Sequence, residues 1–420
     1  MSLAQYFLLG NLLWELSERR LSNKYARQYR PFPLPSPDDR LFNSSDVSII
    51  VPTVDWDGAT FERAIKSWLA NRPRELIVVT TASQLQQAQA FITSARITRA
   101  NHGTKILVSA APRANKREQM LEGVRHSSGK IITFVDDDVF WRPTTLPHLL
   151  APFQELDIGL VGTQVDSDIP RERQNPDIIT CWEVAALRNR SKRRAGNRAF
   201  YAADGSTNFT VSGATILLRA EIAQDPEFQR EFAQETFLGV PQNSGDDSFI
   251  TRWVLFHHLR ESHQAMRWRL GIQITPEATV STTLKTDSSF VHQMKRWLRT
   301  GLRYRLTCLL SEPGFRDFRR TTPYMARKMA EAMLNPILNL LWYVAFSQTL
   351  RRQPFIALLL ALYYLYNQVT GMLAFAREFP YCRQKIWAAV IADKVPLVSD
   401  FYCWATLLVE NWASRPSIDA

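Results

Sequence analysis

Residues 131–141 read IITFVDDDVFW, a run of apolar residues that ends abruptly in three consecutive aspartates. Three similar runs precede it: VSIIVPT at 47–53, ELIVVTT at 75–81 and TKILVSA at 104–110. Each is short and rich in β-branched residues, as strands buried inside a sheet are. The four runs therefore predict four buried strands.

Segments whose apolar residues recur with helical spacing separate these runs, at 61–70, 84–100 and 116–128. Strands that alternate with helices favour an α/β fold, in which helices cover both faces of a mostly parallel sheet. Such sheets bind ligands beyond the carboxyl ends of their strands. The polar residues that end the apolar runs are thus the first candidates for a functional site.

The aspartate triplet is the first of these candidates. On an extended strand, Asp136 and Asp138 would point to one side and Asp137 to the other. One face would then offer two carboxylates, the hard oxygen ligands that suit Mg²⁺ or Mn²⁺ bound to phosphates. The alternative is an acidic turn that caps the next helix. The position at the end of a buried strand favours the metal site.

A second acidic site is SGDD, Ser244 to Asp247, which precedes a segment with helical spacing at 248–258. Ser and Asp are common helix caps, and that alternative stays open. A cap needs only one carboxylate, however, and here there are two. Near a metal–phosphate site, a carboxylate could take a proton from an attacking hydroxyl.

The third feature is the basic segment HQMKRWLRTG at 292–301. With helical spacing, Gln293, Arg296 and Trp297 share one face. A guanidinium can neutralise phosphate, and an indole ring can stack on a sugar. The alternative is a basic amphipathic helix on anionic lipid, and the two interpretations are compatible.

The C-terminal part is more apolar than the rest. Segments 334–350 and 354–376 contain no Asp, Glu, Lys or Arg, and each is about long enough to cross a membrane. A third apolar stretch, 387–410, contains charged residues and is expected to be re-entrant, interfacial or packed in a bundle. FLLGNLLWEL at 7–16 predicts an interfacial anchor or the remnant of a span. A helix packed on the protein core is the alternative for 7–16, and a buried hairpin is the alternative for the two uncharged segments.

Composition excludes several classes of protein. The chain has 420 residues, of which 45% are hydrophobic, so it is not a disordered protein. Its four cysteines lack the spacing of a zinc site or a disulfide framework. The net charge of +11 suits anionic partners, but the positive charge lies beside the apolar segments and no nucleic-acid module is visible. We therefore expect membrane lipid, and no nucleic acid, among the partners; the oligomeric state stays open.

Four motifs occur in a set order: VPTVDWD at 51–57, VDDD at 135–138, SGDD at 244–247 and QMKRW at 293–297. Together they resemble the processive family 2 glycosyltransferases, the membrane-embedded synthases of hyaluronan, chitin and cellulose. The resemblance covers about residues 46–312. It is strongest to the fungal branch of polysaccharide synthases associated with capsules and cell walls, some called type 2 glycosyltransferases.

The resemblance implies a GT-A fold and a nucleotide-sugar donor, a UDP-sugar. Asp136 and Asp138 would hold Mg²⁺ or Mn²⁺ on the donor diphosphate. Asp55 or Asp57 would lie near the nucleotide, and Lys116 would lie near the phosphates. The remaining matches imply Asp247 as the general base with support from Asp246, and Gly213, Gln293, Arg296 and Trp297 around the acceptor and the pyrophosphate.

One position departs from the family pattern. Many relatives end the second strand with an aspartate that helps to hold the nucleotide, whereas this chain has Thr80 and Thr81. A hydroxyl can form a hydrogen bond with uracil or ribose but contributes no charge. This position therefore gives no charged contact to the nucleotide.

The resulting prediction is a membrane-bound, inverting hexosyltransferase that extends a surface or cell-wall polysaccharide. A transferase that adds one sugar to ceramide or polyprenyl phosphate is the nearest alternative, and a non-catalytic membrane-surface protein is a further one. We expect the plasma membrane or a membrane of the secretory pathway, with the catalytic domain in the cytosol. The expected division of the chain is an N-terminal anchor and linker (1–45), a GT-A domain (46–285), interfacial helices (286–330), membrane helices (331–412) and a tail (413–420).

Overall fold

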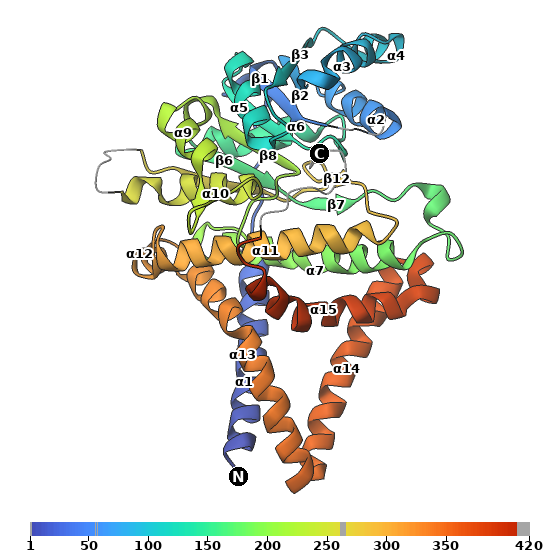
Figure 1. Cartoon of the computed structure of the whole chain (residues 1–420), viewed down its shortest axis with the longest axis vertical. Helices are drawn as coiled ribbons and strands as arrows, with labels where there is room; N and C mark the ends of the chain where they lie inside the picture. The colour runs from blue at the N-terminus through green and yellow to red at the C-terminus, as the bar shows by residue number, and fades with distance from the viewer. Residues whose placement is uncertain (1, 55, 57, 261–265, 410–420) are drawn as a thin grey trace.

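The computed structural model describes residues 2–54, 56, 58–260 and 266–409. Its largest sheet has the strand order β11-β6-β8-β4-β1-β2-β3 (Figure 1). Strand β8 is antiparallel to both neighbours, and the other pairs are parallel, so the predicted mostly parallel α/β sheet is confirmed. The bounds are β1 (Val47–Pro52), β2 (Glu75–Thr81), β3 (Lys105–Ala111), β4 (Ile131–Val135), β6 (Ile158–Thr163), β8 (Thr215–Arg219) and β11 (Arg269–Gln273).

Two smaller sheets accompany the large one. The first has the order β5-β12-β7, and the second is the hairpin of β9 and β10. Their bounds are β5 (Val139–Phe140), β7 (Val165–Ser167), β9 (Thr236–Phe237), β10 (Val240–Pro241) and β12 (Val280–Thr282). The order β5-β12-β7 brings the chain that follows β12 close to the chain that precedes β5.

Helices cover both faces of the large sheet. Alternate residues of a central strand enter different apolar cores: Ile50 packs with α5, α9 and α10, whereas Ile49 and Val51 pack with α2, α4 and α6. The bounds are α2 (Gly58–Leu69), α3 (Leu85–Ile92), α4 (Ala95–Ala100), α5 (Lys116–His126), α6 (Thr145–Leu150), α8 (Ala220–Ala223), α9 (Pro226–Gln234) and α10 (Asp246–Phe256).

Two details of the predicted elements are wrong. The single helix expected over 84–100 is two helices, α3 and α4, because the Thr93 hydroxyl binds the Gln89 carbonyl oxygen at 2.9 Å and Ser94 has an extended backbone. The strand expected to be buried at 104–110 is β3, most of whose residues are only half-buried. It is an edge strand, covered by a neighbouring strand on one side only.

A layer of long helices lies below the sheet (Figure 1). Helices α7 (Cys181–Asp204) and α11 (Ser289–Leu310) pack together through apolar residues that include Ala186 and Met294. Helix α15 (Ile386–Ala405) crosses beneath them and contacts both. The short α12 (Phe315–Thr321) leads from α11 to the helices below.

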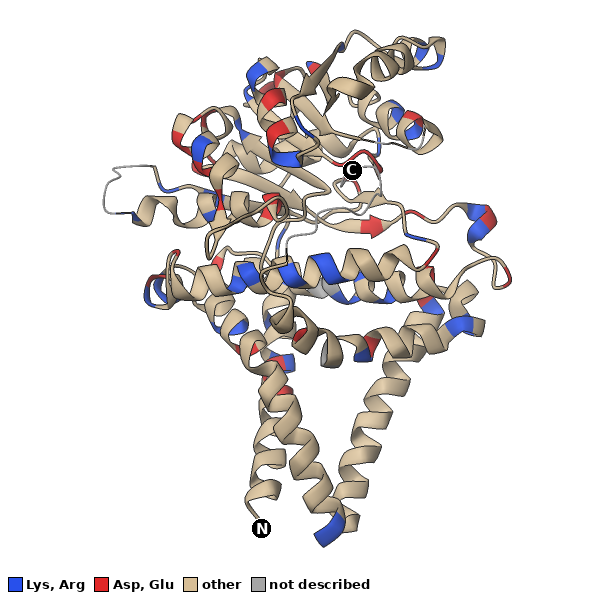
Figure 2. Cartoon of the chain, viewed as in Figure 1, with Lys and Arg blue, Asp and Glu red and all other residues tan. Residues whose placement is uncertain are grey.

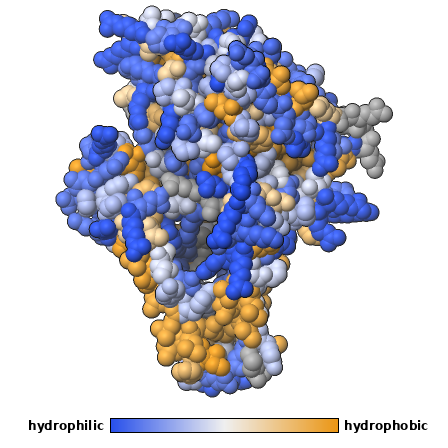
Figure 3. Space-filling view, turned by 180° about the vertical axis from the view of Figure 1, so that it is seen from behind, coloured by the Kyte–Doolittle hydropathy of each residue, from blue (hydrophilic) through white to orange (hydrophobic). Residues whose placement is uncertain are grey.

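The lower end of the molecule is an apolar hairpin of α13 (Pro323–Arg352) and α14 (Pro354–Glu378), with α1 (Leu3–Gln28) beside α13. Charged residues of the hairpin lie at its upper end and at its tip, and the length between them carries none (Figure 2). Apolar side chains gather on this end of the surface (Figure 3). Both hairpin helices are long and apolar enough to cross a membrane, and only 17% and 11% of their apolar windows are buried. Such exposure does not fit the alternative of a buried soluble hairpin.

The N-terminal and third apolar segments both pack against other helices. The apolar start of α1 contacts α13 through Leu8 and Ala345, while α1 also packs on α7. In α15, one of the charged residues that interrupt the apolar stretch is paired, because Asp393 accepts hydrogen bonds from Arg188 at 2.8 Å and lies 2.5 Å from Lys192. Helix α15 thus packs against other helices, and the re-entrant and interfacial expectations for this stretch stay predictions. The predicted domain boundaries stay a prediction.

Candidate active site

One lysine joins the two acidic motifs. Lys116 begins α5, and its Nζ lies 2.9 Å from Oδ1 of Asp136 and 2.9 Å from Oδ2 of Asp246. Burial opposes the positive charge of Lys116, but the two carboxylates outweigh this effect and raise its pKa. Three segments that are far apart in the sequence thus meet at one ammonium group, beyond the carboxyl ends of β3 and β4.

The acidic pair lies in the first turn of α10. The helix begins at Asp246 after Gly245, whose backbone is left-handed (φ +80°), and no side chain caps it. The capping alternative for SGDD is therefore wrong for Ser244 and for both aspartates. Carboxylates in this first turn face the positive end of the helix dipole, which favours their ionised form.

The two carboxylates of this pair differ in pKa. Burial disfavours ionised Asp246, but the ammonium of Lys116 holds the pKa of this carboxyl below its usual range. Asp247 lacks such a partner among the described contacts, and burial together with the charge of Asp246 raises its pKa to about 6. Asp247 accepts hydrogen bonds from the backbone amides of Ser248 at 2.7 Å and Gly213 at 3.3 Å. A carboxylate with this pKa is suited to general-base chemistry near neutral pH.

The aspartate triplet is not extended, so the expected alternation of its side chains is wrong. Strand β4 ends at Val135, and Asp137 and Asp138 lie in a turn. Each aspartate has a different partner: Lys116 for Asp136, the Thr53 hydroxyl at 2.6 Å for Asp137, and the Thr283 hydroxyl at 2.9 Å for Asp138. Burial is the largest of the effects that raise the pKa of Asp138 to about 6, and the negative charges of Asp137 and Asp136 add to it.

These carboxylates fit a divalent cation only in part. Asp136 and Asp138 supply hard oxygen donors, and a cation would relieve the repulsion that raises the pKa of Asp138. Within the described ranges, however, no group of three or more His, Cys, Asp or Glu side chains could hold a metal ion. A bound Mg²⁺ or Mn²⁺ would therefore take its other ligands from the donor diphosphate and from water, as Mg²⁺ commonly does.

Helix α11 packs directly on the acidic loop. The hydroxyls of Ser244 and Thr300 lie 3.1 Å apart, and a Cβ at Gly245 would come within 2.7 Å of the Thr300 methyl. One turn further along, Arg303 donates a hydrogen bond to the side-chain oxygen of Gln242 at 2.8 Å. Helix α11 thus lies beside the acidic loop through Thr300 and Arg303.

The other predicted residues of α11 have different surroundings. Trp297 packs with α7 in a small apolar cluster, and Nε of Arg296 is buried without a hydrogen-bond partner in the described chain. Contacts of Gln293, Arg296 and Trp297 with a donor or an acceptor stay a prediction. Gly213 lies beside the acidic pair, because a Cβ there would be 3.4 Å from Cβ of Asp247.

The remaining donor-side candidates lie at the ends of β1 and β2. Thr80 is buried and donates its hydroxyl hydrogen to Gln84 at 3.1 Å. Asp55 and Asp57 lie outside the described residues. The predicted roles of these three side chains at the nucleotide stay untested.

Sequence reasoning did not foresee three features of this site. The hydroxyl that binds Asp138 comes from Thr283, which belongs to no motif, and the hydroxyl that binds Asp137 comes from Thr53, which lies within VPTVDWD but has no role in the predicted site. The bridging position of Lys116 required knowledge of which loops meet. Behind the acidic pair, the ion pairs of Glu235 with Arg117 and Arg252 have no local sequence signal at all.

Comparison with known proteins decides the family. Residues 45–300 match the model of the family described as "Glycosyltransferase like family 2". The chain belongs to glycosyltransferase family 2. The prediction of the family and of the GT-A-like fold is therefore confirmed, and the protein is a glycosyltransferase.

Relatives of this glycosyltransferase occur in fungi. It is 33% identical over 407 residues to NDP-glycosyltransferase ltbB of Aspergillus luteorubrus, which covers 96% of this chain and 95% of the relative. It is 32% identical over 284 residues to a type 2 glycosyltransferase of Zymoseptoria tritici, which covers 68% of this chain. The match spans only 55% of that relative's length.

A solved structure shares the fold of this family 2 enzyme. The mannosyltransferase of Pyrobaculum calidifontis, solved with GDP-Man and Mn²⁺, superposes with a TM-score of 0.54 at 17% identity. The superposition covers 95% of this chain and 99% of the mannosyltransferase. At this identity the likeness establishes the architecture, and the donor and metal belong to the archaeal protein.

Proposed function

We propose that this glycosyltransferase moves a sugar from a UDP-sugar to an acceptor hydroxyl by an inverting displacement, with Asp247 as the base. The observation that carries the proposal is the meeting of Asp136, Lys116 and Asp246 at 2.9 Å contacts. Because of these contacts, the end of β4 lies next to the acidic pair. A donor diphosphate would bind at the end of this central strand, and an acceptor would be deprotonated at the acidic pair.

The donor side would consist of Asp136 and Asp138 as ligands of Mg²⁺ or Mn²⁺. When bound, the cation would neutralise charge on the leaving diphosphate. Lys116 and Arg296 would donate hydrogen bonds to the same oxygens, and Thr80 with Asp55 or Asp57 would bind the nucleoside. The Mn²⁺ in the Pyrobaculum mannosyltransferase supports use of a divalent metal.

On the acceptor side, one carboxylate is left to act as base. Asp246 forms an ion pair with Lys116, whereas Asp247 has a pKa of about 6 and is ionised at neutral pH. Asp247 would take the proton of the acceptor hydroxyl as the new glycosidic bond forms and the bond to the diphosphate breaks. Direct attack of the acceptor inverts the anomeric centre, and Gly213 leaves room for the acceptor beside the carboxylates.

We further propose a growing surface or cell-wall polysaccharide as the acceptor, which the resemblance of the four motifs to the polysaccharide synthases implies. A membrane lipid is the second candidate. It is favoured by the position of the apolar hairpin directly below the layer of α7, α11 and α15 (Figure 1). A lipid-anchored acceptor could reach the acidic loop along α11, which packs on both.

The same arrangement supports a membrane location. The hairpin would insert into the plasma membrane or a membrane of the secretory pathway, and the sheet would lie in the cytosol with the nucleotide sugars. Basic residues at the start of α13 agree with this orientation, because positively charged flanks favour the cytosolic side. Arg351 and Arg352 at the hairpin tip do not agree with it.

One experiment tests both the donor and the product. Full-length protein in membranes is incubated with labelled UDP-glucose, UDP-N-acetylglucosamine, UDP-glucuronate and GDP-mannose, with and without Mn²⁺. We expect Mn²⁺-dependent incorporation from a UDP-sugar into a product of high molecular mass. A single-sugar product that extracts into organic solvent would establish the lipid acceptor, and incorporation from GDP-mannose alone would overturn the UDP assignment.

A further inference from the structure

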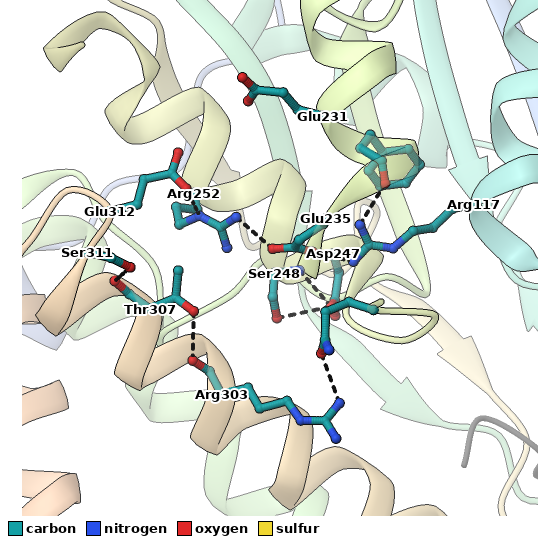
Figure 4. Close-up of polar contacts among 12 residues, drawn as sticks. Arg117, Glu231, Glu235, Asp247, Ser248, Arg252, Arg303, Thr307, Ser311 and Glu312 are labelled. Carbon is teal, nitrogen blue, oxygen red and sulfur yellow. Dashed lines mark hydrogen bonds and ion pairs between the residues drawn. The ribbon is translucent and has the colours of Figure 1, made fainter. Parts of the chain in front are cut away.

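A buried ion-pair network lies directly behind the acidic pair (Figure 4). It starts at Arg117, the neighbour of Lys116 in α5, whose residue surface is only 2% exposed. Arg117 donates hydrogen bonds to the Phe232 carbonyl at 2.8 Å, to Glu235 at 2.5 Å and to the Ser244 carbonyl at 3.2 Å. One side chain thus ties the first turn of α5 to the loop that leads into Asp246.

The second arm of the network comes from α10. Arg252, which is 4% exposed, donates a hydrogen bond to the other oxygen of Glu235 at 2.6 Å. Its Nε donates to Glu312 at 3.1 Å. The two carboxylate oxygens of Glu235, at the end of α9, are therefore each bound by an arginine from a different helix.

The same two helices meet again in the active site. Helix α5 carries Lys116 and helix α10 carries Asp246, and these residues form the 2.9 Å contact described above. The ion pairs of Glu235 lie behind this contact and join the two helices a second time. Helices α5 and α10 are thus linked at two points: by the Lys116–Asp246 ion pair and by Glu235, which binds Arg117 and Arg252. The first turn of α10 therefore cannot rotate about the Lys116–Asp246 contact without breaking the hydrogen bonds of Glu235.

From this geometry we infer that Glu235 is a positioning residue of the transferase: it fixes Asp247 relative to Lys116 without touching substrate. The inference rests on the proposed role of Asp247 as base. Burial disfavours the charge of Glu235, but Arg252 and Arg117 outweigh it and hold the pKa of this carboxyl below its usual range. The two arginines thus favour the ionised form of Glu235, which accepts their hydrogen bonds.

The substitution Glu235→Gln removes the negative charge of the side chain and keeps its size and shape. A glutamine side chain has one acceptor oxygen and one NH₂ group, so it can accept a hydrogen bond from one arginine but presents donors to the other. One buried guanidinium then loses its carboxylate partner, and an unpaired buried charge raises the free energy of the folded state. The freed arginine lets α10 move relative to α5, and a small displacement of a catalytic group costs a large factor in rate.

A matched control lies one turn earlier on α9. Glu231 forms the same type of ion pair, with Arg260 at 2.5 Å, and belongs to the same network through Glu312. Its described contacts do not include Lys116, Ser244 or Arg252. Glu231→Gln therefore removes an ion pair of equal chemistry without loosening the joint between α5 and α10.

The test measures full-length wild type, E235Q, E235D and E231Q in detergent, each below its own unfolding temperature. The readouts are kcat and donor KM with the most active nucleotide sugar, and binding of UDP with Mn²⁺. We expect E235Q to lose at least about tenfold in kcat, equivalent to 1.4 kcal/mol, with UDP binding and donor KM changed less than about threefold. E235D, which keeps the charge, should recover part of the loss, and E231Q should match wild type in kcat.

Two results would overturn the inference. An E235Q protein that unfolds at lower temperature but keeps the wild-type kcat would show a purely structural role, as would an equal loss of kcat in E231Q. If E235Q does not fold, E235D takes its place, and its kcat, donor KM and UDP binding are compared with those of E231Q. A kcat of E235D equal to that of E231Q would then overturn the inference. A normal kcat in E235Q combined with an inactive D247N protein would reject the positioning role and leave the proposed function standing.

Discussion

Lys116 and Arg117 are neighbours in the sequence, yet their side chains enter two buried charge clusters of opposite design. The site cluster holds one lysine among four aspartates, Asp136, Asp138, Asp246 and Asp247. The support cluster alternates three arginines with three glutamates, Arg117, Glu235, Arg252, Glu312, Arg260 and Glu231. The first has an excess of negative charge, and the second is balanced.

The difference in balance has a measurable consequence for the carboxylates. In the support cluster, arginines outweigh the effect of burial and lower the pKa of Glu235 and Glu312. In the site cluster, Asp138 and Asp247 have a pKa of about 6 because burial and neighbouring aspartates oppose their charge. A balanced cluster holds helices in place, whereas unneutralised carboxylates are ready to bind a cation or a proton.

The largest expected effect comes from Asp247→Asn in the site cluster. An amide cannot accept the proton of the acceptor hydroxyl, so kcat should fall by about 10²–10⁴-fold, the contribution typical of a general base. UDP binding and the unfolding temperature should stay near wild type, because Asp247 makes no ion pair in the described structure. Steady-state kinetics with calorimetric UDP titration measures both.

A surface aspartate provides the control for this substitution. Asp317 on α12 is 47% exposed in its side chain and pairs only loosely with Arg320 at 3.4 Å. Asp317→Asn should leave kcat unchanged, since such exposed pairs contribute little. Near-normal turnover in D247N would show that Asp247 is not the base and that the excess negative charge of the site cluster does not serve proton transfer.

Much of the fold was predictable because its signals are local. Strands β1, β2 and β4 consist almost entirely of buried residues, most of them apolar, and the helices between them have a clear apolar face. The acidic and basic motifs stand out by their composition, and their order along the chain is enough to indicate the family. The single helix expected at 84–100 is interrupted where the Thr93 hydroxyl binds a backbone carbonyl and Ser94 has an extended backbone.

The site cluster was predictable in membership but not in geometry. The alternation argument for Asp136 to Asp138 assumed that the strand continues, whereas β4 ends one residue before the triplet. The support cluster could not be predicted at all. Its ion-paired residues are 17 to 118 positions apart in the sequence. A glutamate after a helix is, by sequence, an ordinary surface residue.

A second prediction concerns the metal. Asp138→Ala removes one of the two proposed ligands, so the Mn²⁺-dependent part of UDP binding should weaken at least about tenfold. Asp137→Asn is the matched control from the same turn, because Asp137 accepts a hydrogen bond from Thr53 inside the fold. It should lower the unfolding temperature and keep the metal effect. Isothermal titration with UDP, with and without Mn²⁺, distinguishes the two.

The opposite pattern would contradict the assignment of the triplet. If UDP affinity in D138A still rises with Mn²⁺ as in wild type, then Asp138 does not bind the metal. If D137N instead loses the metal effect at an unchanged unfolding temperature, the ligand is the middle aspartate. The excess charge of the site cluster would then be arranged around Asp137.

The smallest expected effect is a shift in pH dependence, which follows from the coupling of Asp246 and Asp247. As a base, Asp247 must be ionised, so kcat/KM should fall tenfold per pH unit below about pH 6. Because its pKa in the folded protein lies above the ordinary 3.8, protonation of Asp247 stabilises the folded state, and this stabilisation is lost as pH rises through 6. The fall in kcat/KM at acidic pH therefore reports titration of the site carboxylates, Asp247 and Asp138, rather than unfolding.

Asp246→Asn tests the source of this raised pKa. Removing the neighbouring negative charge should lower the pKa of Asp247 and move the acidic limb of kcat/KM to lower pH, while Lys116 still pairs with Asp136. E231Q, which alters only the support cluster, should leave the limb in place. A limb that does not move in D246N would mean that burial alone sets the pKa, and that the site cluster acts as separate carboxylates rather than as one coupled group.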